Sequence, residues 1–262
     1  MDGNAVVAAD LQSGVGPSPT LPIFTLNGRV VIVTGGASGL GLVMSKAIVD
    51  TYVFSQSKGD QAAIQAVNLT EVFKAQHSSR PPPLITAHYA DVSDPASVSS
   101  CVADVVARHG KVDSLVTSAG FTENWPATEY PVDRMRRLWA VNVDGTHLFA
   151  VEVARHLMAR KVGEAWSSLA ACQAPSSTFL SPRRRRTALG LLLAVEWATA
   201  GIRDGKILEE RPDLKEKWIG GIPMGRMGNP QDLMGPVTFL LSDASRYVTG
   251  ADLRVDGGYT AI

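Results

Sequence analysis

The stretch VVIVTGGASGLG, residues 30–41, decides the fold of this chain. Its first four residues are apolar and β-branched, which predicts a strand buried on both faces, as in a parallel sheet. Glycines follow at Gly35, Gly39 and Gly41, and apolar residues at helical spacing come next. A strand, a glycine turn and a helix in this order are typical of a turn that binds a pyrophosphate at the helix N-terminus. The alternative is an ordinary strand-to-helix turn, but the buried strand before it favours the binding turn.

The pattern T-G-x-x-x-G-x-G, which runs from Thr34 to Gly41, resembles the short-chain dehydrogenase/reductase family. The resemblance implies an α/β fold, a Rossmann-like doubly wound parallel sheet with a cofactor crevice at the carboxyl ends of its strands. It also implies NAD or NADP as the cofactor. The turn residues that it would place on the cofactor are Gly35, Ser38, Gly39, Leu40 and Gly41.

Length and composition describe an ordinary globular chain. With 262 residues, 45% of them apolar and 19% charged, the sequence fits a single α/β domain over residues 21–262. Residues 1–20 are rich in Gly, Ser, Pro and Ala, and we expect them to form a disordered lead-in. Basic and acidic residues number 25 each, so no global field attracts nucleic acid or an anionic membrane.

Apolar runs and cysteines bear on the compartment of the protein. The sequence has no run of eighteen apolar residues that would predict a transmembrane helix, and residues 1–20 do not resemble a secretory signal. Cys101 and Cys172 are the only cysteines, which is too few for a disulfide framework, and their spacing is not that of metal ligands. We therefore expect no metal site and a reducing, cytoplasmic setting.

The second strand of the sheet is hard to find. A dinucleotide-binding half needs an apolar run that ends in a charged residue about twenty residues after the glycine turn, to hold or reject the ribose 2′ oxygen. The best candidate is Tyr52–Phe54, and the flanking Asp50 and Asp60 fit poorly as ribose ligands, so we expect both to be solvated. The sheet is therefore expected to be missing or distorted at its second strand, and NAD and NADP both remain candidates.

Helical periodicity recurs along the chain. It predicts helices over residues 41–49, 60–77 and 134–148, and others that begin at Asp94-Pro95 and at Asn229-Pro230. The core face of the helix after Asp94 consists of Val98, Cys101, Val102 and Val105. Cys101 is therefore expected to be a core residue rather than a reactive one.

Two more strand ends are predicted to line the crevice. The apolar runs at residues 84–90 and 112–117 predict strands, and the residues that follow their carboxyl ends include Asp91, Val92, Ala119 and Gly120. The family resemblance implies that Asp91 and Val92 contact the adenine, whereas the alternative for Asp91 is a capping role. Small residues such as Ala119 and Gly120 let the cofactor ribose lie against the backbone.

The helix predicted at residues 134–148 contains Asn142-Val143-Asp144-Gly145. This resembles the N-V-x-G motif of the family, and the resemblance implies that Asn142 is a catalytic residue that holds a water in the proton relay. The alternative is a polar residue inside a helix without a special role. Near the end of the chain, Pro223–Arg226 and Val255–Tyr259 bound a stretch that looks like the last helix and strand of the family.

The catalytic segment of the family is absent from this sequence. The family uses a tyrosine as general acid and base, a lysine four residues later that lowers its pKa, and a serine about a dozen residues earlier. The residues four positions after Tyr52, Tyr89, Tyr130 and Tyr247 are Gln56, Ser93, Arg134 and Ala251, and Tyr259 lies too near the end. Tyr130 with Arg134 is the nearest approach, but it precedes the Asn142 helix.

Residues 163–187 stand where that segment should be. They contain no β-branched apolar run, so we expect the strand that should carry the serine to be missing. The four arginines at 183–186 are interpreted as an exposed basic run rather than as a phosphate or nucleic-acid site. Leu191–Ala198 again resembles the end of the catalytic helix, but Arg203 runs directly into Asp204, and the joint has the appearance of a deletion.

Three interpretations follow. The first is an NAD(P)-dependent oxidoreductase that interconverts a polyol or secondary alcohol and a ketose or ketone, because residues 115–124 and 223–228 look like the fungal polyol dehydrogenases and ketose reductases. The second is a catalytically inactive nucleotide-binding homologue. The third is a defective product, mis-spliced or frame-shifted. The resemblance implies a small-molecule substrate of the polyol and ketose class and a homo-oligomer.

Overall fold

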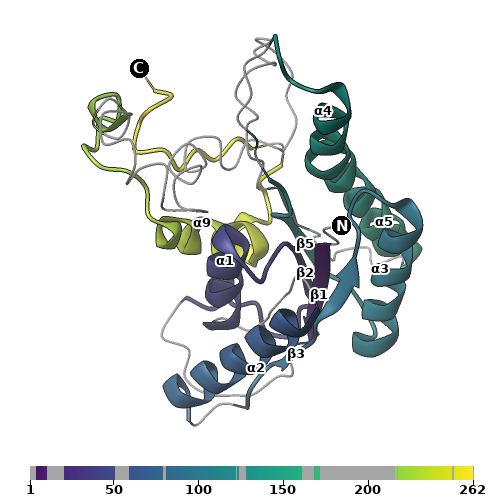
Figure 1. Ribbon diagram of the computed structural model, residues 1–262. Helices are drawn as coiled ribbons and strands as arrows, with labels where there is room; N and C mark the ends of the chain where they lie inside the picture. Colours follow the sequence, from purple (N-terminus) through teal and green to yellow (C-terminus); the bar gives the residue numbers. More distant parts are fainter. Residues whose placement is uncertain are drawn as a thin grey trace.

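A computed structural model gives the fold of the chain (Figure 1). It describes residues 4–10, 21–50, 59–78, 81–121, 123, 128–160, 168–171, 216, 218–249 and 251–261. The predicted second strand at Tyr52–Phe54, the four arginines and the joint at Arg203 lie outside the described residues.

The glycine turn follows the central strand of one sheet. β2 (Val31–Thr34) pairs in parallel with β5 (Ser114–Thr117), and β5 pairs in parallel with β6 (Ser168–Ala171). In the described residues the strand order is β3-β1-β2-β5-β6, and β4 pairs with β1. The parallel strands β2, β5 and β6 end at the same edge of the sheet. This confirms the predicted α/β fold.

The first strand lies inside the stretch that is expected to be a disordered lead-in, and the structure describes only residues 4–10 of that stretch. Asn4–Asp10 form β1, which pairs antiparallel with β2, with β3 (Leu84–Ile85) and with β4 (His88–Ala90). The composition of residues 1–20 concealed a short apolar run, AVVAA, that is long enough for a strand. Since β5 occupies the other side of β2, both edges of the central strand are filled, and the sheet is mixed rather than wholly parallel.

The strand β6 corrects a second expectation. Residues 163–187 were predicted to contain no strand, yet Ser168–Ala171 pair with β5 in the register Thr117 opposite Ala171. Serine and alanine have low β-propensity, which is why the sequence pattern missed them. The open edge of β5 offers backbone N–H and C=O groups that pair with any backbone, so position in the fold outweighs propensity.

Helices cover both faces of the sheet (Figure 1). On one face lie α1 (Gly39–Asp50), α2 (Gly59–Gln76), η3 (Pro230–Leu233) and α9 (Met234–Leu241). On the other lie α3 (Pro95–His109), α5 (Gly145–Ala159) and the π-helical turn η2 (Ala140–Asp144), which continues α4 (Val132–Trp139). Short 3-10 turns complete the described helices at η1 (Pro22–Phe24) and η4 (Asp243–Ser245).

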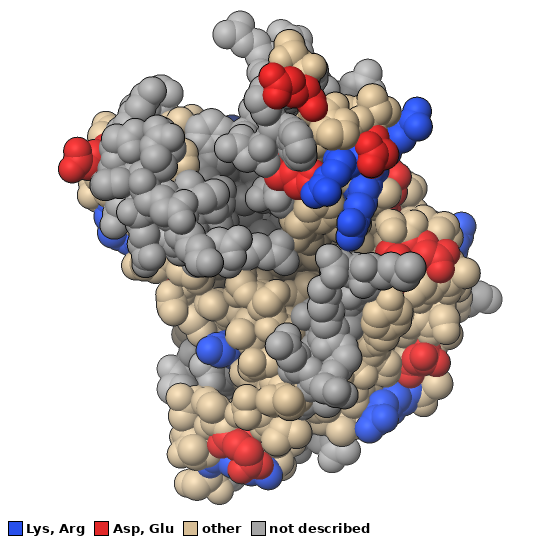
Figure 2. All heavy atoms as spheres, in the orientation of Figure 1, with Lys and Arg blue, Asp and Glu red and all other residues tan. Residues whose placement is uncertain are grey.

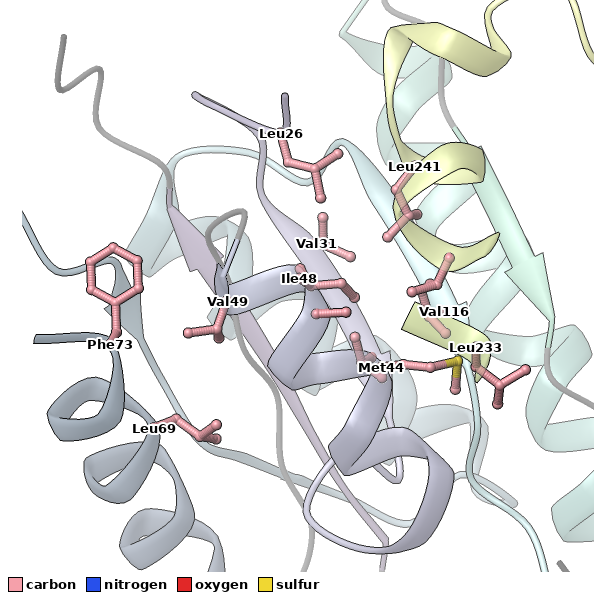
Figure 3. Close-up of a cluster of buried hydrophobic side chains, with 13 residues drawn as sticks. Leu26, Val31, Met44, Ile48, Val49, Leu69, Phe73, Val116, Leu233 and Leu241 are labelled. Carbon is pink, nitrogen blue, oxygen red and sulfur yellow. The ribbon is translucent and has the colours of Figure 1, made fainter. Parts of the chain in front are cut away.

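The two apolar cores meet at β2, whose side chains alternate between them. Val31 and Val33 join the cluster under α1, α2 and α9 that Figure 3 draws, whereas Ile32 joins the cluster under α3 and α5. All four residues of β2 are buried. Burial of a Val or Ile side chain contributes about 1.5–3 kcal/mol, so the continuous apolar run fixes this strand at the centre.

The helix α3 forms as predicted. The carboxylate of Asp94 accepts hydrogen bonds from the backbone N–H of Ala96 (3.1 Å) and of Ser97 (3.2 Å), and Gly110 ends the helix with φ +78°. Cys101 is buried, and desolvation with the nearby Asp104 raises the pKa of its thiol to about 12. The predicted core role of Cys101 is confirmed.

The end of the chain departs in part from its prediction. Asn229 and Asp232 form a capping box before α9, and Leu233 of η3 with Val237 and Leu241 of α9 are buried, as expected of the predicted apolar stripe. The side chain of Arg226 and the backbone N–H of Asn229 donate hydrogen bonds to Asp232, which lowers the pKa of its carboxyl. In the described residues, Ala251–Val255 do not pair with the sheet, although Leu253 and Val255 pack against the core below α9.

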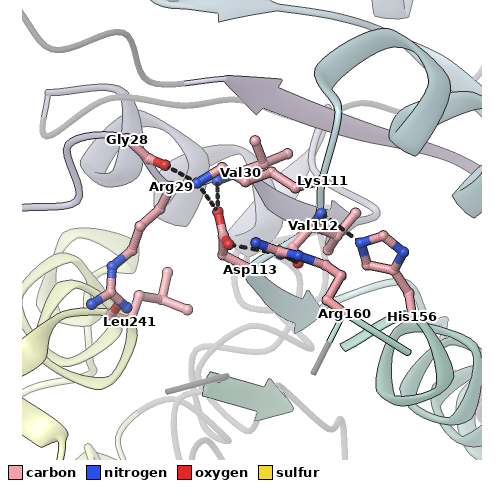
Figure 4. Close-up of polar contacts among 9 residues, drawn as sticks. All are labelled: Gly28, Arg29, Val30, Lys111, Val112, Asp113, His156, Arg160 and Leu241. Carbon is pink, nitrogen blue, oxygen red and sulfur yellow. Dashed lines mark hydrogen bonds and ion pairs between the residues drawn. The ribbon is translucent and has the colours of Figure 1, made fainter. Parts of the chain in front are cut away.

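A polar cluster ties the amino ends of β2 and β5 together (Figure 4). The carboxylate of Asp113 accepts hydrogen bonds from the backbone N–H of Val30 (2.7 Å) and from Arg160 (3.0 Å), and it pairs with Lys111 (2.9 Å). His156 Nε2 accepts a hydrogen bond from the backbone N–H of Val112 (3.2 Å), so this nitrogen carries no proton. The cluster lies at the edge opposite the strands' carboxyl ends, and its role is to hold the sheet.

We expect the stability of the protein to fall as the pH is lowered from 7 to 5. Desolvation lowers the pKa of His156, Arg160 lowers it further, and Asp113 opposes them in part; desolvation also lowers the pKa of His88. Because each folded-state pKa lies below the value of about 6.5 in the unfolded chain, stability rises with pH in the window below that value and is constant above it. Thermal unfolding from pH 5 to 8 measures this. His156→Gln keeps an acceptor for Val112 and should flatten the curve, and an equally steep curve would contradict the assignment.

Candidate nucleotide-binding site

The glycine turn lies directly against the strand end beside it. Gly35 has φ +69°, and a Cβ added there would lie 2.8 Å from the Cα of Ala119 and 2.9 Å from the carbonyl oxygen of Ser118. A Cβ at Gly41 would overlap the carbonyl oxygen of Gly35. Both contacts forbid a side chain, so the two glycines allow α1 and the end of β5 to approach the turn closely.

The start of α1 opens towards the crevice edge of the sheet. The helix begins at Gly39, which has φ +53°, and the backbone N–H of Leu42 makes an early helical bond to the carbonyl of Ser38 (3.2 Å). Ser38 and Gly39 are exposed, whereas Leu40 is half-buried against the core. The first N–H groups of a helix have no acceptor within the helix and carry the positive end of its dipole, so an anion is stabilised there.

Thr34 is a site residue that the sequence analysis did not single out. Its hydroxyl accepts hydrogen bonds from the backbone N–H groups of Ser118 and Ala119, both at 3.0 Å, and its side chain is buried. These bonds fix the end of β5 to the end of β2. A threonine between a buried strand and a glycine turn is the only signal that could have identified it.

Asp91 and Val92 follow β4 at the same edge. The Asp91 carboxylate accepts hydrogen bonds from the backbone N–H (2.9 Å) and the hydroxyl (2.6 Å) of Ser93, and its own N–H donates to the hydroxyl of Ser97 (2.9 Å). Asp94, rather than Asp91, caps α3, and the Asp91 carboxylate instead closes a turn with Ser93 before this helix. These bonds hold Asp91 half-buried at a fixed place, which an adenine contact also needs.

Asn142 clamps the segment after β5. Its side-chain amide donates to the carbonyl of Phe121 (2.8 Å), and its oxygen accepts from the N–H of the same residue (3.1 Å). The side chain is buried, and it sits in the π-helical turn η2, an irregularity that is frequent at functional sites. A Cβ at Gly120 would lie 3.1 Å from the Asn142 oxygen, so this glycine leaves room for the clamp. A catalytic role of Asn142 stays a prediction.

The predicted cofactor residues thus form one continuous border along the carboxyl edge. Gly35 touches Ala119, Gly120 faces Asn142, and a Cβ at Gly145 would lie 2.8 Å from Val92. The turn leaves no space for side chains and lies beside an exposed helix start, which fits the pyrophosphate of a dinucleotide. The fixed carboxylate fits the adenine. They do not by themselves provide a proton donor.

Tyr130 is the described tyrosine that is followed four positions later by a basic residue, Arg134. Desolvation raises the pKa of its phenol, Glu123 raises it further, and Arg134 opposes them in part. Arg134 is itself bound to Glu123, with Nε–O distances of 3.0 and 3.1 Å. A base that works near neutral pH needs a lowered phenol pKa, so this environment acts in the wrong direction.

Charge and metal ligands add no further site to the part of the chain that the structure describes. Figure 2 shows Lys and Arg interspersed with Asp and Glu on one face, without a large area of one sign among the described residues. No group of three or more His, Cys, Asp and Glu side chains in these residues is placed to hold a metal ion. Among the described helices, none is both long and apolar enough to cross a membrane.

Comparison with known proteins decides the family. A family model described as enoyl-(acyl carrier protein) reductase matches residues 56–260, which is most of the chain. The chain belongs to the short-chain dehydrogenase/reductase family. By family it is therefore an NAD(P)-dependent oxidoreductase.

Relatives of this short-chain dehydrogenase/reductase act on sugars and polyols, as their names state. The D-arabinitol 2-dehydrogenase (ribulose-forming) of Candida tropicalis is 30% identical over 275 residues, covering 91% of this chain and 95% of that protein. A sorbose reductase of Candida albicans is 30% identical, covering 93% and 91% of the two chains. The D-threitol dehydrogenase of Mycolicibacterium smegmatis is 32% identical and covers 90% and 95%.

Solved structures share the fold of this chain. A gluconate 5-dehydrogenase from Burkholderia cenocepacia, in complex with NADP and tartrate, has a TM-score of 0.67 and 25% identity, and covers 92% of this chain and 98% of that one. An NADPH-dependent 3-quinuclidinone reductase from Rhodotorula rubra has a TM-score of 0.65 at 20% identity, covering 94% and 98%. The doubly wound fold predicted from the glycine turn is confirmed.

Proposed function

We propose that this short-chain dehydrogenase/reductase binds NAD or NADP along the carboxyl edge of its sheet and has lost hydride transfer. The observation that carries the binding proposal is the continuous border of Gly35, Ala119, Gly120 and Asn142, with the exposed start of α1 beside it. In the intact family the nicotinamide accepts or donates a hydride. What this chain supplies is the support for the nucleotide, through the α1 N–H groups and Asp91.

We propose polyols and ketoses as the substrate class of the intact enzyme from which this chain derives. The support is the set of relatives at about 30% identity, which are named for D-arabinitol, sorbose and D-threitol. The same names favour a second candidate function, an active oxidoreductase that interconverts a polyol or secondary alcohol with a ketose or ketone. Both candidate functions require binding of NAD or NADP, but only the second includes catalytic turnover.

The sequence lacks the groups that transfer the proton in the family. No tyrosine has a lysine four residues later, and no residue type in the glycine-turn border is a proton donor with a suitable pKa. A defective product, mis-spliced or frame-shifted, would explain why well-matched sequence lies on both sides of residues 163–187. Reading the transcript across these codons separates such a product from a homologue that has retained only nucleotide binding.

Calorimetric titration with NAD+ and NADP+ tests the binding proposal. We expect affinity that is measurable but at least a hundredfold weaker than that of an intact relative, because each charge-assisted hydrogen bond that is lost costs about 1.5–3 kcal/mol. Gly39→Val should abolish the heat of binding, since it strains a positive-φ position at the start of α1.

Gly110→Val is the matched control for this titration. Gly110 also has a positive φ, at +78°, and nothing lies within 4 Å of an added Cβ, but it ends α3 rather than facing the crevice. It should therefore cost similar backbone strain and leave binding intact. A low-micromolar dissociation constant that Gly39→Val does not change would refute the proposed site.

A further inference from the structure

Two histidine rings meet at one hydroxyl group between β4 and the end of α3. The Oγ1 atom of Thr86 lies 2.9 Å from Nε2 of His88 and 2.7 Å from Nε2 of His109. His88 is the first residue of β4, His109 is the last residue of α3, and their ring centroids lie 6.5 Å apart. Thr86 and His109 are buried and His88 is half-buried. These three side chains, the Thr86 bridge, therefore hold the start of β4 against the end of α3.

The hydrogen bonds of the Thr86 bridge depend on the protonation of its two rings. A hydroxyl group carries a single proton, so Thr86 can donate to Nε2 of one ring at most, and the other ring must donate to it. A neutral imidazole can take either role, because its proton can sit on either nitrogen. Protonation of an accepting ring turns its Nε2 into a second donor that faces the same hydroxyl, and it adds a positive charge to a largely buried site.

The surroundings of His88 disfavour that charge. Desolvation lowers the pKa of His88, Asp104 on α3 opposes this in part, and Arg108 on the same helix lowers the pKa further. The closed bridge therefore keeps this ring neutral at a pH at which an exposed histidine is already charged.

The other charged groups on the adjoining elements have different neighbours. Glu71 and Lys74 of α2 form an ion pair with each other (2.7 Å), and the ring of His77, just after α2, lies 4.8 Å from that of Phe73. In β1, Asp10 lies four residues along the strand from the position opposite the first residue of β4. The charge of His88 is thus set mainly from α3.

We infer that the Thr86 bridge is a proton-sensitive contact that opens in acid and releases the strand leading to the adenine border. Asp91 and Val92 follow β4 directly, so the link to the adenine rests on the proposed dinucleotide binding. In the open state His88 regains an ordinary pKa of about 6.5. At pH 5.5 a ring that charges only in the open state favours opening about tenfold more than at pH 7.5.

Hydrogen–deuterium exchange on the full chain at pH 7.5 and 5.5 tests the opening. After correction for intrinsic exchange rates, the amides of residues 84–91 should lose about tenfold in protection at the lower pH, relative to the amides of β5, which report on unfolding of the whole sheet. His88→Gln keeps a donor and an acceptor for Thr86 but takes up no proton, so its protection should not respond to pH. Thr86→Ser keeps the hydroxyl and should keep the response. His147→Gln, at an exposed position on α5, is the matched control and should behave as the unmodified chain does.

Bound nucleotide tests the link to the adenine border. Because binding favours the closed state, NAD+ or NADP+ at ten times its dissociation constant should restore about tenfold in protection of residues 84–91 at pH 5.5. Protection of these residues that does not change with pH, or that falls equally in His88→Gln, would overturn the inference. A pH response that bound nucleotide does not reverse overturns the link to the adenine. If no nucleotide binds at either pH, the proposed function fails, and exchange still decides whether the bridge opens.

Discussion

No reduction of NAD+ or NADP+ above the enzyme-free rate is expected when the purified chain is mixed with D-arabinitol or mannitol, and no oxidation of NADH or NADPH with sorbose. A phenol with an ordinary pKa near 10 needs a nearby cation to act as a base around neutral pH. No tyrosine of this chain has the lysine four residues later that supplies it in the family. General acid–base catalysis contributes about 10²–10⁴-fold, and the amide of Asn142 cannot replace it.

The D-arabinitol 2-dehydrogenase of Candida tropicalis, assayed under the same conditions, is the positive control. Tyr130 is the residue to test, since Arg134 follows it by four positions, although its pKa is raised by desolvation and by Glu123. Turnover at a rate comparable with the control that disappears in Tyr130→Phe would show that the expectation is wrong and that Tyr130 acts as the proton donor.

The largest effect on stability is expected from Gly41→Ala. The added Cβ would overlap the carbonyl oxygen of Gly35 and lie 2.8 Å from its carbonyl carbon, and both atoms belong to backbone that cannot rotate away. Overpacking of this kind costs about 1–3 kcal/mol, which in a chain of this size lowers Tm by several degrees. Because the shift must displace the turn itself, dinucleotide binding should be lost together with stability.

Gly235→Ala is the control that distinguishes the steric overlap at Gly41 from a general effect of placing alanine in a helix. Gly235 is exposed in α9, and nothing lies within 4 Å of an added Cβ. Alanine there overlaps nothing outside its chain neighbours, and although the following Pro236 disfavours a helical alanine, its cost should stay below that of Gly41→Ala. Denaturant unfolding of the two variants gives the comparison, and equal stabilities would mean that α1 and the turn are not packed as closely as described.

The sequence predicted those helices and strands whose local residue pattern matches their burial and capping in the structure. The β-branched run before Gly35 is buried on both faces, and Asp94 caps α3 as its position before a proline suggested. Asn142 lies in a helical stretch, as predicted, but its bonds to the backbone of Phe121 depend on a contact distant in sequence that no local pattern encodes.

Two strands escaped prediction for the same physical reason. β1 (NAVVAAD) and β6 (SLAA) are rich in alanine and show no alternation, so their local preference for a strand is weak. Each is stabilised by the open edge of a neighbouring strand, β2 or β5, and that edge exists only once the sheet has formed.

The strand β1 also governs the order in which the sheet can assemble. In the described residues, the backbone pairing between the parallel strands β2, β5 and β6 and the short strands β3 and β4 runs entirely through β1. Val6 pairs with Thr34 across the connection formed by residues 11–30, and with His88 across a far longer stretch of chain. Contacts so distant in sequence close slowly, because the entropy of the intervening loop is lost before they form. Until β1 is in place, the far side of the sheet has no strand on which to form, and folding waits on the first few residues of the chain.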